Sequence, residues 1–233
     1  MLTCLCCGKQ ETEKVLLKDI VYFKKLVSAN RCQTCQSRLA PLANEVTCLG
    51  CCRIKQDGND WCLDCIKWKK TYPDYPFSHT ALFQYNSFLK EWLENFKYKG
   101  DYRLAKLFDQ ELTDYFNAKN QKNKKCIPIP ISQASMELRG FNQVEELLTS
   151  AGIEFYPALV HIGTGKKQSS KNRKERMESD QPFKLDEKYC KQLKNKRVIL
   201  IDDVYTTGRT LFHAAELLRQ AEATTIETFS IAR

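Results

Sequence analysis

Two adjacent carboxylates and a loop of small polar residues follow an aliphatic run near the carboxyl end of this 233-residue sequence. The aliphatic run, Val198–Ile201, predicts a strand that is buried on both faces. Asp202 and Asp203 come next, where two carboxylates can accept hydrogen bonds from neighbouring hydroxyl groups of a sugar. Thr206–Thr210 then turns into a helix, and Gly208 lets the backbone approach a ligand closely. Because free N–H groups at a helix start attract anions, this segment predicts a sugar-phosphate site.

Twelve cysteines provide the second kind of chemistry. Eight of them form four Cys-x-x-Cys pairs: Cys4/Cys7, Cys32/Cys35, Cys48/Cys51 and Cys62/Cys65. Two such pairs supply the four thiolates of a tetrahedral structural zinc site. The simplest assignment pairs them in sequence order, one ion on Cys4, Cys7, Cys32 and Cys35 and a second on Cys48, Cys51, Cys62 and Cys65. A crossed pairing is also compatible with the spacing, and Cys6 and Cys52 are left over.

The expected metal sites are structural rather than catalytic. A catalytic zinc keeps an open position and usually has a histidine or carboxylate ligand. The three histidines, His79, His161 and His213, all lie outside the cysteine-rich region. So small a cysteine-rich segment should need its metal in order to fold.

Two basic stretches could contact a nucleic-acid backbone. Near the end of the cysteine-rich region, Trp68, Lys69 and Lys70 combine basic side chains with an aromatic ring. This combination suits binding to single-stranded DNA. The aromatic rings there could equally pack within the protein. The second stretch lies between 166 and 176 and contains Lys166, Lys167 and Arg173, which could bind pyrophosphate, a DNA backbone or only solvent.

The composition indicates a folded protein in a reducing compartment. Hydrophobic residues make up 42% and charged residues 28% of the chain. No signal peptide or membrane span is recognisable, and free cysteines in this number favour metal ligation over disulfides. We therefore expect a cytoplasmic protein. The formal net charge is +9, and two four-thiolate zinc sites would reduce it to about +5 (9 − 4), which does not by itself indicate nucleic-acid binding.

The site-bearing residues need a framework of alternating strands and helices. Strands are expected at 81–85, 126–131, 155–162, 198–201 and 226–231, and helices from Phe88 to near Gly100, from an Asp101 cap to Phe116, and at 144–150, 187–193 and 209–221. Alternation of this kind predicts a parallel sheet, in which ligands bind beyond the carboxyl ends of the strands. The proline-rich stretch 72–76 separates residues 1–72, a double zinc ribbon, from residues 77–233, an α/β domain.

The segment Val198–Thr210 resembles the signature for 5-phosphoribosyl-1-pyrophosphate (PRPP) of type I phosphoribosyltransferases. The resemblance implies that fold, and it implies that Asp202 and Asp203 bind the ribose hydroxyls. The residues implied at the 5′-phosphate are Thr206, Thr207, Gly208, Arg209 and Thr210, and Mg²⁺ could accompany PRPP. The alternative is a buried strand followed by an acidic helix cap, which fits an isolated aspartate pair better than the whole pattern. Pro128–Pro130 stands where this fold has its pyrophosphate loop, but could simply end a strand.

A narrower resemblance follows from several motifs in order. They are Lys97–Asp101, Pro128–Pro130, Arg139–Gln143, Gln168, Arg176, Phe183 and the PRPP signature. With an amino-terminal double zinc ribbon, the whole chain resembles the ComF (ComFC) family of late competence proteins. The family implies DNA uptake in natural transformation, on the cytoplasmic side of the import channel, and a ComFA-type ATPase partner. Arg139 suits a phosphate, or with Asn142 it caps the following helix.

This sequence departs from the family pattern at two positions, His161 and Ser179, where arginine and asparagine are usual. Thr206 replaces the acidic residue that purine-salvage relatives carry in the phosphate loop. Three functions remain open. The first is a competence factor that binds PRPP and helps an ATPase to handle single-stranded DNA. The second is an active phosphoribosyltransferase on an unidentified acceptor, and the third is an adaptor with a vestigial site. The first accounts for the basic ribbon as well as the family pattern.

Overall fold

The computed structural model describes residues 2–11, 30–55, 58–73, 78–118, 123–163 and 181–233. Its amino-terminal elements are β1 (Leu2–Thr3), β2 (Gln10–Glu11), α2 (Gln33–Gln36), η1 (Leu42–Asn44) and α3 (Leu63–Thr71). The elements that follow are β3 (His79–Phe83), α4 (Ser87–Tyr98), η2 (Tyr102–Phe108), α5 (Asp109–Asn117), β4 (Lys125–Pro128), α6 (Gln133–Arg139), α7 (Gln143–Ser150), β5 (Leu159–His161), β6 (Phe183–Leu185), α9 (Glu187–Leu193), β7 (Arg197–Val204), α10 (Arg209–Gln220) and β8 (Thr225–Ala232).

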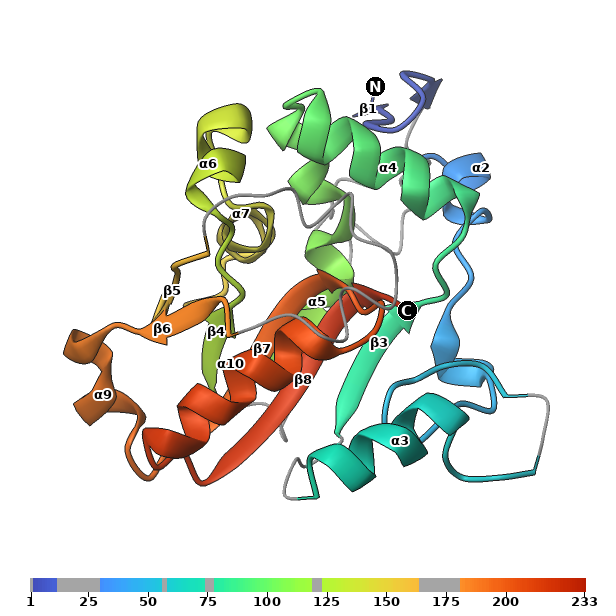
Figure 1. Cartoon of the computed structure of the whole chain (residues 1–233). Coiled ribbons are helices and arrows are strands. Elements are labelled where there is room, and N and C mark those ends of the chain that lie inside the picture. The colour runs from blue at the N-terminus through green and yellow to red at the C-terminus, as the bar shows by residue number, and fades with distance from the viewer. Residues whose placement is uncertain (1, 12–29, 56–57, 74–77, 119–122, 164–180) are drawn as a thin grey trace, which may run out of the picture.

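A four-stranded parallel sheet forms the centre of the molecule, with strand order β3-β8-β7-β4 (Figure 1). Side chains alternate across β7, so that Ile199 and Ile201 belong to one hydrophobic cluster and Val198 and Leu200 to the other. The first cluster is built with α4, η2, α5 and α7, and the second with α10 and the Trp68 side of α3. The predicted parallel sheet with helices on both faces is therefore confirmed.

The cysteine-rich segments pack against this α/β framework. Cys4, Cys32 and Cys35 belong to the same hydrophobic cluster as the α4 side chains. Pro41 forms an isolated antiparallel bridge with Phe83, at the end of β3. Contacts thus cross the predicted division between 1–72 and 77–233. Of the residues between these two ranges, 74–76 lie outside the described residues.

Two predicted elements are wrong in their details. The predicted strand 155–162 is reduced to β5, which pairs antiparallel with β6. Tyr156 donates one hydrogen bond to the carbonyl of Cys126, 2.8 Å, but Pro157 has no N–H and ends the ladder. The predicted helix 101–116 is the 3₁₀ helix η2 followed by α5. The Asp101 carboxylate accepts from the Arg103 guanidinium instead of capping the helix.

Helix α6 was not predicted, because its sequence has no apolar face with a helical period. In the structure none of its residues is buried. Helices α2, η1 and α3 in the cysteine-rich region were not predicted either, whereas α4, α7, α9 and α10 lie close to their predicted ranges. None of the helices in the described segments has the length and apolar character needed to cross a lipid bilayer.

Candidate sugar-phosphate site and cysteine clusters

The two adjacent aspartates lie within β7, at its carboxyl end, rather than beyond it. Asp202 pairs in register with Ser230 of β8, and successive side chains point to opposite faces. Asp203 is buried, whereas Asp202 is partly exposed. The N–H of Asp203 donates to Asp202 Oδ1, 2.9 Å, and the N–H of Val204 donates to Asp203 Oδ1, 2.7 Å. The two carboxylates therefore differ in environment, although both stand at the carboxyl edge of the sheet.

Lys97 is the partner of Asp203 and had no role assigned from the sequence. Its ammonium group forms an ion pair with Asp203 Oδ2, and the side chains are 15% and 6% exposed. Lys97 lies in the last turn of α4. The adjacent Phe96 is buried in the hydrophobic cluster that also contains Ile199 and Ile201 of β7, so this end of α4 packs beside the sheet. The only signal in the sequence was its place in the motif Lys97–Asp101. This partly buried cation offsets the charge of Asp203 at the edge of the sheet where a polyanionic ligand would bind.

The pKa of Asp202 is raised to about 7. Although the side chain is partly exposed, the burial of most of it disfavours the charged carboxylate most strongly, and the nearby negative charge of Asp203 adds to this effect. The Lys97 ammonium and the Asp203 N–H act in the opposite direction. A ligand that donates hydrogen bonds to Asp202, or a cation that accompanies it, would favour the ionised carboxylate.

The predicted phosphate loop, Thr206–Thr210, follows Tyr205 at the end of β7 and includes the first two residues of α10. Gly208 has φ +83°, and a Cβ at this position would lie 2.2 Å from Tyr205 Oη, so that only glycine fits. Among the described residues no side chain caps the first turn of α10, although Thr207 Oγ1 accepts a long 3.4 Å hydrogen bond from the Arg209 N–H. Thr206 is exposed, and Thr210 is partly exposed. This arrangement presents a helix start to an anion.

The sheet register brings the loop after β4 to the same edge. Pro128 pairs with Ile201, and the Ile129 N–H donates to the Ile201 carbonyl, 2.9 Å. Pro128–Pro130 therefore leaves the sheet beside the two aspartates, as expected of a loop that could contact the same ligand.

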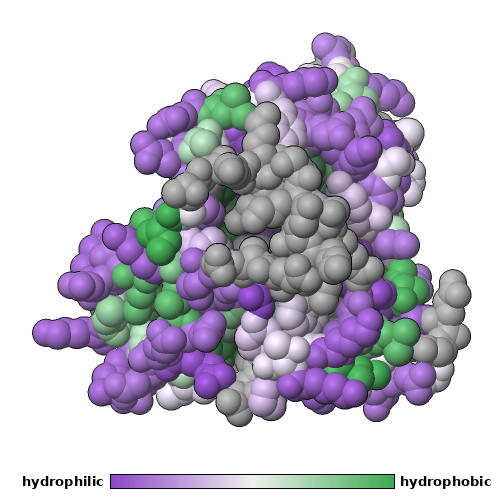
Figure 2. Space-filling model, in the orientation of Figure 1, coloured by the Kyte–Doolittle hydropathy of each residue, from purple (hydrophilic) through white to green (hydrophobic). Residues whose placement is uncertain are grey.

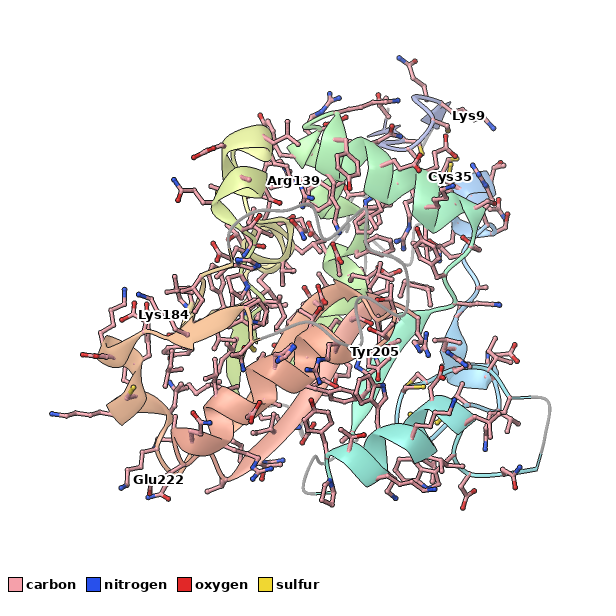
Figure 3. All side chains as sticks on the ribbon, in the orientation of Figure 1. Lys9, Cys35, Arg139, Lys184, Tyr205 and Glu222 are labelled. Atoms are coloured by element: carbon pink, nitrogen blue, oxygen red, sulfur yellow. The ribbon has the colours of Figure 1, made fainter. Side chains whose placement is uncertain are left out.

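Arg139 ends α6, and Figure 3 shows it between α6 and α4. Its Nη1 donates to Gln143 Oε1, 3.0 Å, and its guanidinium lies 5.3 Å from the Tyr98 ring centre. Its buried Nε has no hydrogen-bond partner among the residues that the structure describes. Asn142, by contrast, caps α7 by accepting from the Val144 N–H, 3.0 Å. The alternative in which both residues cap a helix therefore holds for Asn142, and Arg139 is left with donor capacity.

The eight paired cysteines form two clusters in sequence order. Cys4, Cys7, Cys32 and Cys35 make the first cysteine cluster, and Cys48, Cys51, Cys62 and Cys65 make the second. Within each cluster the sulfur atoms lie within 4.8 Å of one another. The Cys7–Cys32 and Cys51–Cys62 sulfur distances are both 3.7 Å. Tetrahedral thiolates at about 2.3 Å from one ion would be about 3.8 Å apart, so each cluster could bind a metal ion.

Hydrogen bonds stabilise the thiolate form of one cysteine in each cluster, Cys4 and Cys48. Burial alone would raise the pKa of Cys4, but hydrogen bonds from the backbone of Cys32, Cys7 and Cys6 lower it to about 6. The pKa of Cys48 is also lowered, chiefly by a hydrogen bond from the Cys51 thiol. The pKa of Cys51 is raised to about 11, because its own proton is shared with Cys48. Four thiols at this spacing ionise together only if a cation offsets their charge.

The left-over cysteines have other partners. The Cys52 thiol donates to the His79 carbonyl, 2.9 Å. Burial raises the pKa of Cys6 to about 12. Neither belongs to a cluster.

Of the predicted DNA-contacting residues, the structure exposes some, buries one and does not describe the others. Lys69 and Lys70 are exposed on α3, and the Lys69 ammonium lies 3.7 Å from the Trp61 ring centre. Trp68 is only 4% exposed and packs against Phe212, so its ring cannot stack on a base in this structure. Its assignment as a DNA contact is corrected to a packing role, the other role that the sequence allowed. Lys166, Lys167 and Arg173 lie outside the described residues, as do Gln168, Arg176 and Ser179.

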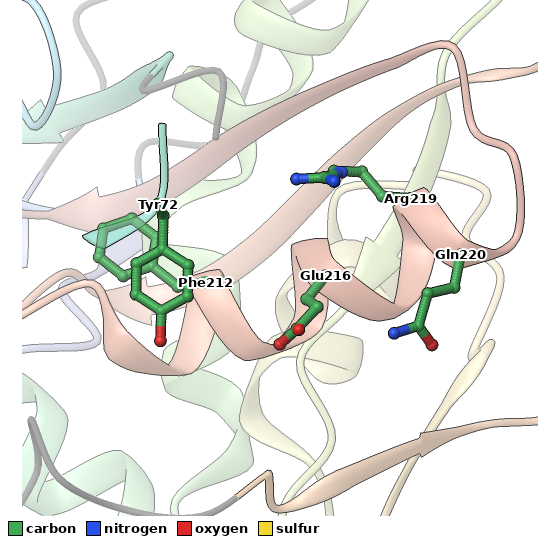
Figure 4. Close-up of a pocket in the computed structure, with 5 residues that line it drawn as sticks. All are labelled: Tyr72, Phe212, Glu216, Arg219 and Gln220. Atoms are coloured by element: carbon green, nitrogen blue, oxygen red, sulfur yellow. The ribbon is translucent and has the colours of Figure 1, made fainter. Parts of the chain in front are cut away.

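A pocket of about 240 Å³ opens beside α10 (Figure 4). It is lined by Tyr72, Phe212, Glu216, Arg219 and Gln220. Glu216 and Gln220 lie one turn and two turns further along α10 than Phe212, away from the phosphate loop. This pocket is therefore separate from the two aspartates.

Comparison with known proteins identifies the family of this chain. Residues 159–233 match the phosphoribosyl transferase domain family. The matched segment contains β7, the phosphate loop and α10. Over 237 residues the chain is 33% identical to "Competence protein ComFC" of Streptococcus pneumoniae (strain ATCC BAA-255 / R6), with 100% of both chains covered. The chain belongs to the ComFC family of competence proteins. Its identity to the ComFC protein of Bacillus subtilis (strain 168) is 29%, covering 100% of this chain and 95% of that protein.

Solved structures give a looser likeness. A hypoxanthine phosphoribosyltransferase from Staphylococcus aureus is 16% identical, covers 59% of this chain and 65% of its own, and has a TM-score of 0.31. The allosteric regulatory enzyme of purine biosynthesis is also 16% identical, with a TM-score of 0.32 over 53% of this chain and 24% of its own. Alignments this loose give no residue correspondence. The domain match and the parallel sheet identify this ComFC family member as a phosphoribosyltransferase fold, as predicted.

The pKa of Asp202 makes stability depend on pH. In the unfolded chain the carboxyl ionises near its ordinary value of 3.8, but in the folded chain it ionises near 7. The folded state therefore binds the extra proton between these values, and stability falls as pH rises from about 4 to about 7. Asp202→Asn should remove this loss, which is worth about 2 to 4 kcal/mol.

Urea unfolding at pH 4.5 and pH 8 measures the effect. Buried His79, whose pKa is lowered to about 3, changes stability in the opposite direction, so the comparison is between variant and wild type. Asp114→Asn, at an exposed position on α5, is the control. An Asp202→Asn variant with the wild-type pH slope would contradict the raised pKa.

Proposed function

We propose that this ComFC family member binds PRPP, with Mg²⁺, at the carboxyl edge of its sheet and acts with a ComFA-type ATPase on single-stranded DNA during natural transformation. The competence role is supported by the family. The remaining parts are argued from the arrangement of the described residues. On this proposal the protein works at the cytoplasmic side of the DNA import channel.

One observation carries the PRPP proposal. Two carboxylates, a partly buried ammonium group and a glycine-dependent helix start meet at one edge of a parallel sheet. Sugar hydroxyls donate hydrogen bonds, for which Asp202 and Asp203 supply acceptors. A phosphate accepts them, for which the start of α10 supplies donors. A ribose that carries a 5′-phosphate has both groups, and carboxylate oxygens also suit the Mg²⁺ that a pyrophosphate would bring.

The metal of the two cysteine clusters is proposed to be zinc. Four thiolates in tetrahedral array are the donor set that structural zinc prefers over magnesium or calcium. Thiolate ligation would change the net charge from +9 to about +5 (9 − 4). The ions would have a structural role, because each cluster already provides four ligands.

Single-stranded DNA is proposed to follow the exposed face of α3. Lys67, Lys69 and Lys70 are all exposed there. Lys69 lies over the Trp61 ring, which leaves a mixed cationic and aromatic surface. Such surfaces bind single strands without sequence preference, through phosphate charge and base stacking.

The partner ATPase is proposed to cover apolar surface around the second cysteine cluster. Val46, Leu49, Leu63 and Ile66 are 70%, 61%, 76% and 42% exposed. Figure 2 shows hydrophobic surface on the side where Figure 1 places α3. Exposed apolar side chains gathered in one region favour a protein interface. Co-purification of the two proteins is the measurement that tests this part.

Purified protein should contain two equivalents of zinc. Elemental analysis after purification without chelator measures this directly. Cys7→Ser should reduce the content to about one equivalent, because Cys7 is the exposed ligand of the first cluster. Cys190→Ser, outside both clusters, should leave two. One equivalent in the wild type, or another metal, would contradict the zinc proposal.

PRPP binding should depend on both carboxylates. Asp202→Asn and Asp203→Asn are preferable to alanine, because alanine at 203 would leave the Lys97 ammonium buried without its partner. Each variant should lose about 1 to 3 kcal/mol of PRPP binding, the usual range for a hydrogen bond to a charged group. Affinity for inorganic phosphate should remain, because the phosphate loop is unchanged.

Calorimetry with PRPP and with phosphate measures both effects. Wild-type PRPP affinity in both variants would contradict the assignment. Rapid pyrophosphate release by the wild type, with a panel of bases and amines as acceptors, would instead favour an active phosphoribosyltransferase.

Binding to single-stranded DNA should weaken steeply with salt. Replacing Lys69 and Lys70 by alanine should reduce the slope of log affinity against log salt by about 0.7 for each phosphate that the two lysines neutralise. Fluorescence anisotropy with a labelled oligonucleotide over a salt series measures the slope. Lys90→Ala with Lys99→Ala, two exposed lysines near α4, is the matched control. An unchanged slope in the Lys69 and Lys70 variant would exclude α3 as the contact.

A further inference from the structure

The phosphate loop is held from one side by residues of the second cysteine cluster and of the helix that follows it. Arg233, which follows β8, lies between the loop and the cluster. Its Nη1 donates to the carbonyls of Tyr205 and Thr206, at 3.3 and 3.2 Å. Its Nε donates to the Cys51 carbonyl, 2.9 Å, and its Nη2 to the Cys51 sulfur, 3.5 Å. One guanidinium thus joins a cluster ligand to two successive loop carbonyls.

Trp68 makes the next connection. Its Nε1 donates to the Thr207 carbonyl, 2.9 Å. Trp68 lies on α3, which begins after Cys62 and contains Cys65, so two cluster ligands position this helix. The indole packs edge-on against Phe212 with 4.6 Å between ring centres. Tyr72, at the end of α3, accepts a hydrogen bond from the Arg209 guanidinium.

These contacts determine which way the loop amides point. In a trans peptide the C=O of one residue and the N–H of the next point in opposite directions. Because the carbonyls of Tyr205, Thr206 and Thr207 are bonded on the cluster side, the N–H groups of Thr206, Thr207 and Gly208 point away from it. Successive N–H groups turned to one side form an anion-binding concavity. Since Gly208 is packed against Tyr205, whose ring lies 4.7 Å from the Arg233 guanidinium, the loop has little freedom to turn back.

We propose that the second cysteine cluster, when it holds its metal, is the scaffold that orients the phosphate loop, with Arg233 and Trp68 as the positioning residues. The ligand class is a phosphomonoester, and the inference rests on the proposed PRPP function for its choice of probe. The first cysteine cluster, which packs with α4 and η2, has no such role. Metal loss at the second cluster would therefore weaken phosphate binding more than 100 residues away in sequence.

Two conservative variants test the positioning role. Arg233→Gln removes the guanidinium fork, and Trp68→Phe removes one N–H while keeping an aromatic ring against Phe212. Two variants serve as matched controls. Arg53→Gln lies near the second cluster, where Arg53 pairs with Asp64, 2.7 Å, and Trp92→Phe removes the indole N–H that donates to the Leu104 carbonyl, 3.1 Å, on α4. The PRPP dissociation constant should rise about tenfold in each positioning variant and less than about twofold in each control.

Amide hydrogen exchange gives a readout that general destabilisation would not reproduce. Exchange in peptides covering 205–212 should accelerate in Arg233→Gln and Trp68→Phe, while zinc content and exchange in β7 stay at wild-type values. Cys62→Ser should accelerate the same peptides, and Cys7→Ser, in the first cluster, should not. The two positioning variants keep the test valid if a cysteine variant does not fold.

The outcomes separate the two proposals. Unchanged loop exchange and unchanged PRPP affinity in both positioning variants would overturn this inference and leave the PRPP site standing. A wild-type protein that binds neither PRPP nor phosphate would overturn the proposed function, and the exchange data would still decide whether the cluster orients the loop. Equal effects of Cys7→Ser and Cys62→Ser on loop exchange would also overturn the inference.

Discussion

Burial of β7 on both faces is the constraint on which the rest of the structure depends. Four consecutive aliphatic residues fill the sheet centre, with helices over each face. The strand then continues through Asp202 and Asp203 to Val204. A carboxylate that enters such a region must be paired or must gain a proton, because leaving it charged and alone is costly. Asp203 is paired by Lys97, and Asp202 has a raised pKa. The polar edge of the sheet is thus a direct result of its apolar centre.

The cysteine-rich segments extend this core and are continuous with it. The first cluster shares a hydrophobic cluster with α4 and η2, and the second shares one with β7 and α10. Specific hydrogen bonds also join the cysteine-rich segments to the α/β framework. Arg31 donates to the Leu107 carbonyl, 2.6 Å, near the first cluster, and Arg233 bridges the second cluster to the phosphate loop. A metal-dependent fold in these segments would therefore support the sheet edge as well as itself.

The module formed by the second cysteine cluster and α3 has two different faces. Its inner face, with Trp68 and Tyr72, packs against the start of α10. Its outer face shows exposed lysines and exposed aliphatic side chains. In the proposed function, one small module therefore holds the phosphate loop on one side and offers a surface for DNA or protein on the other. This division follows from the helical period, because Trp68 and its neighbours Lys67 and Lys69 cannot point in the same direction.

The sequence by itself determined the parts of the protein that depend on local pattern. The aliphatic run Val198–Ile201 predicted the central strand β7, because a strand that is buried on both faces has no polar positions. Four Cys-x-x-Cys pairs indicated two metal sites, since the ligand spacing is contained in each pair. Val198–Thr210 indicated the sugar-phosphate site for the same reason, since its carboxylates and its loop are adjacent in the chain.

Only the tertiary structure decided how distant residues meet. Lys97 reaches Asp203 and Arg233 reaches Cys51 across more than 100 residues of chain, and no local pattern encodes either pair. The burial of Trp68 was also undecided, because its sequence neighbours are charged and its partner Phe212 is far away. Helix α6 has no buried residue and therefore left no periodic signal. Local chemistry was readable from the sequence, whereas charge pairing and packing arise only when the sheet brings its elements together.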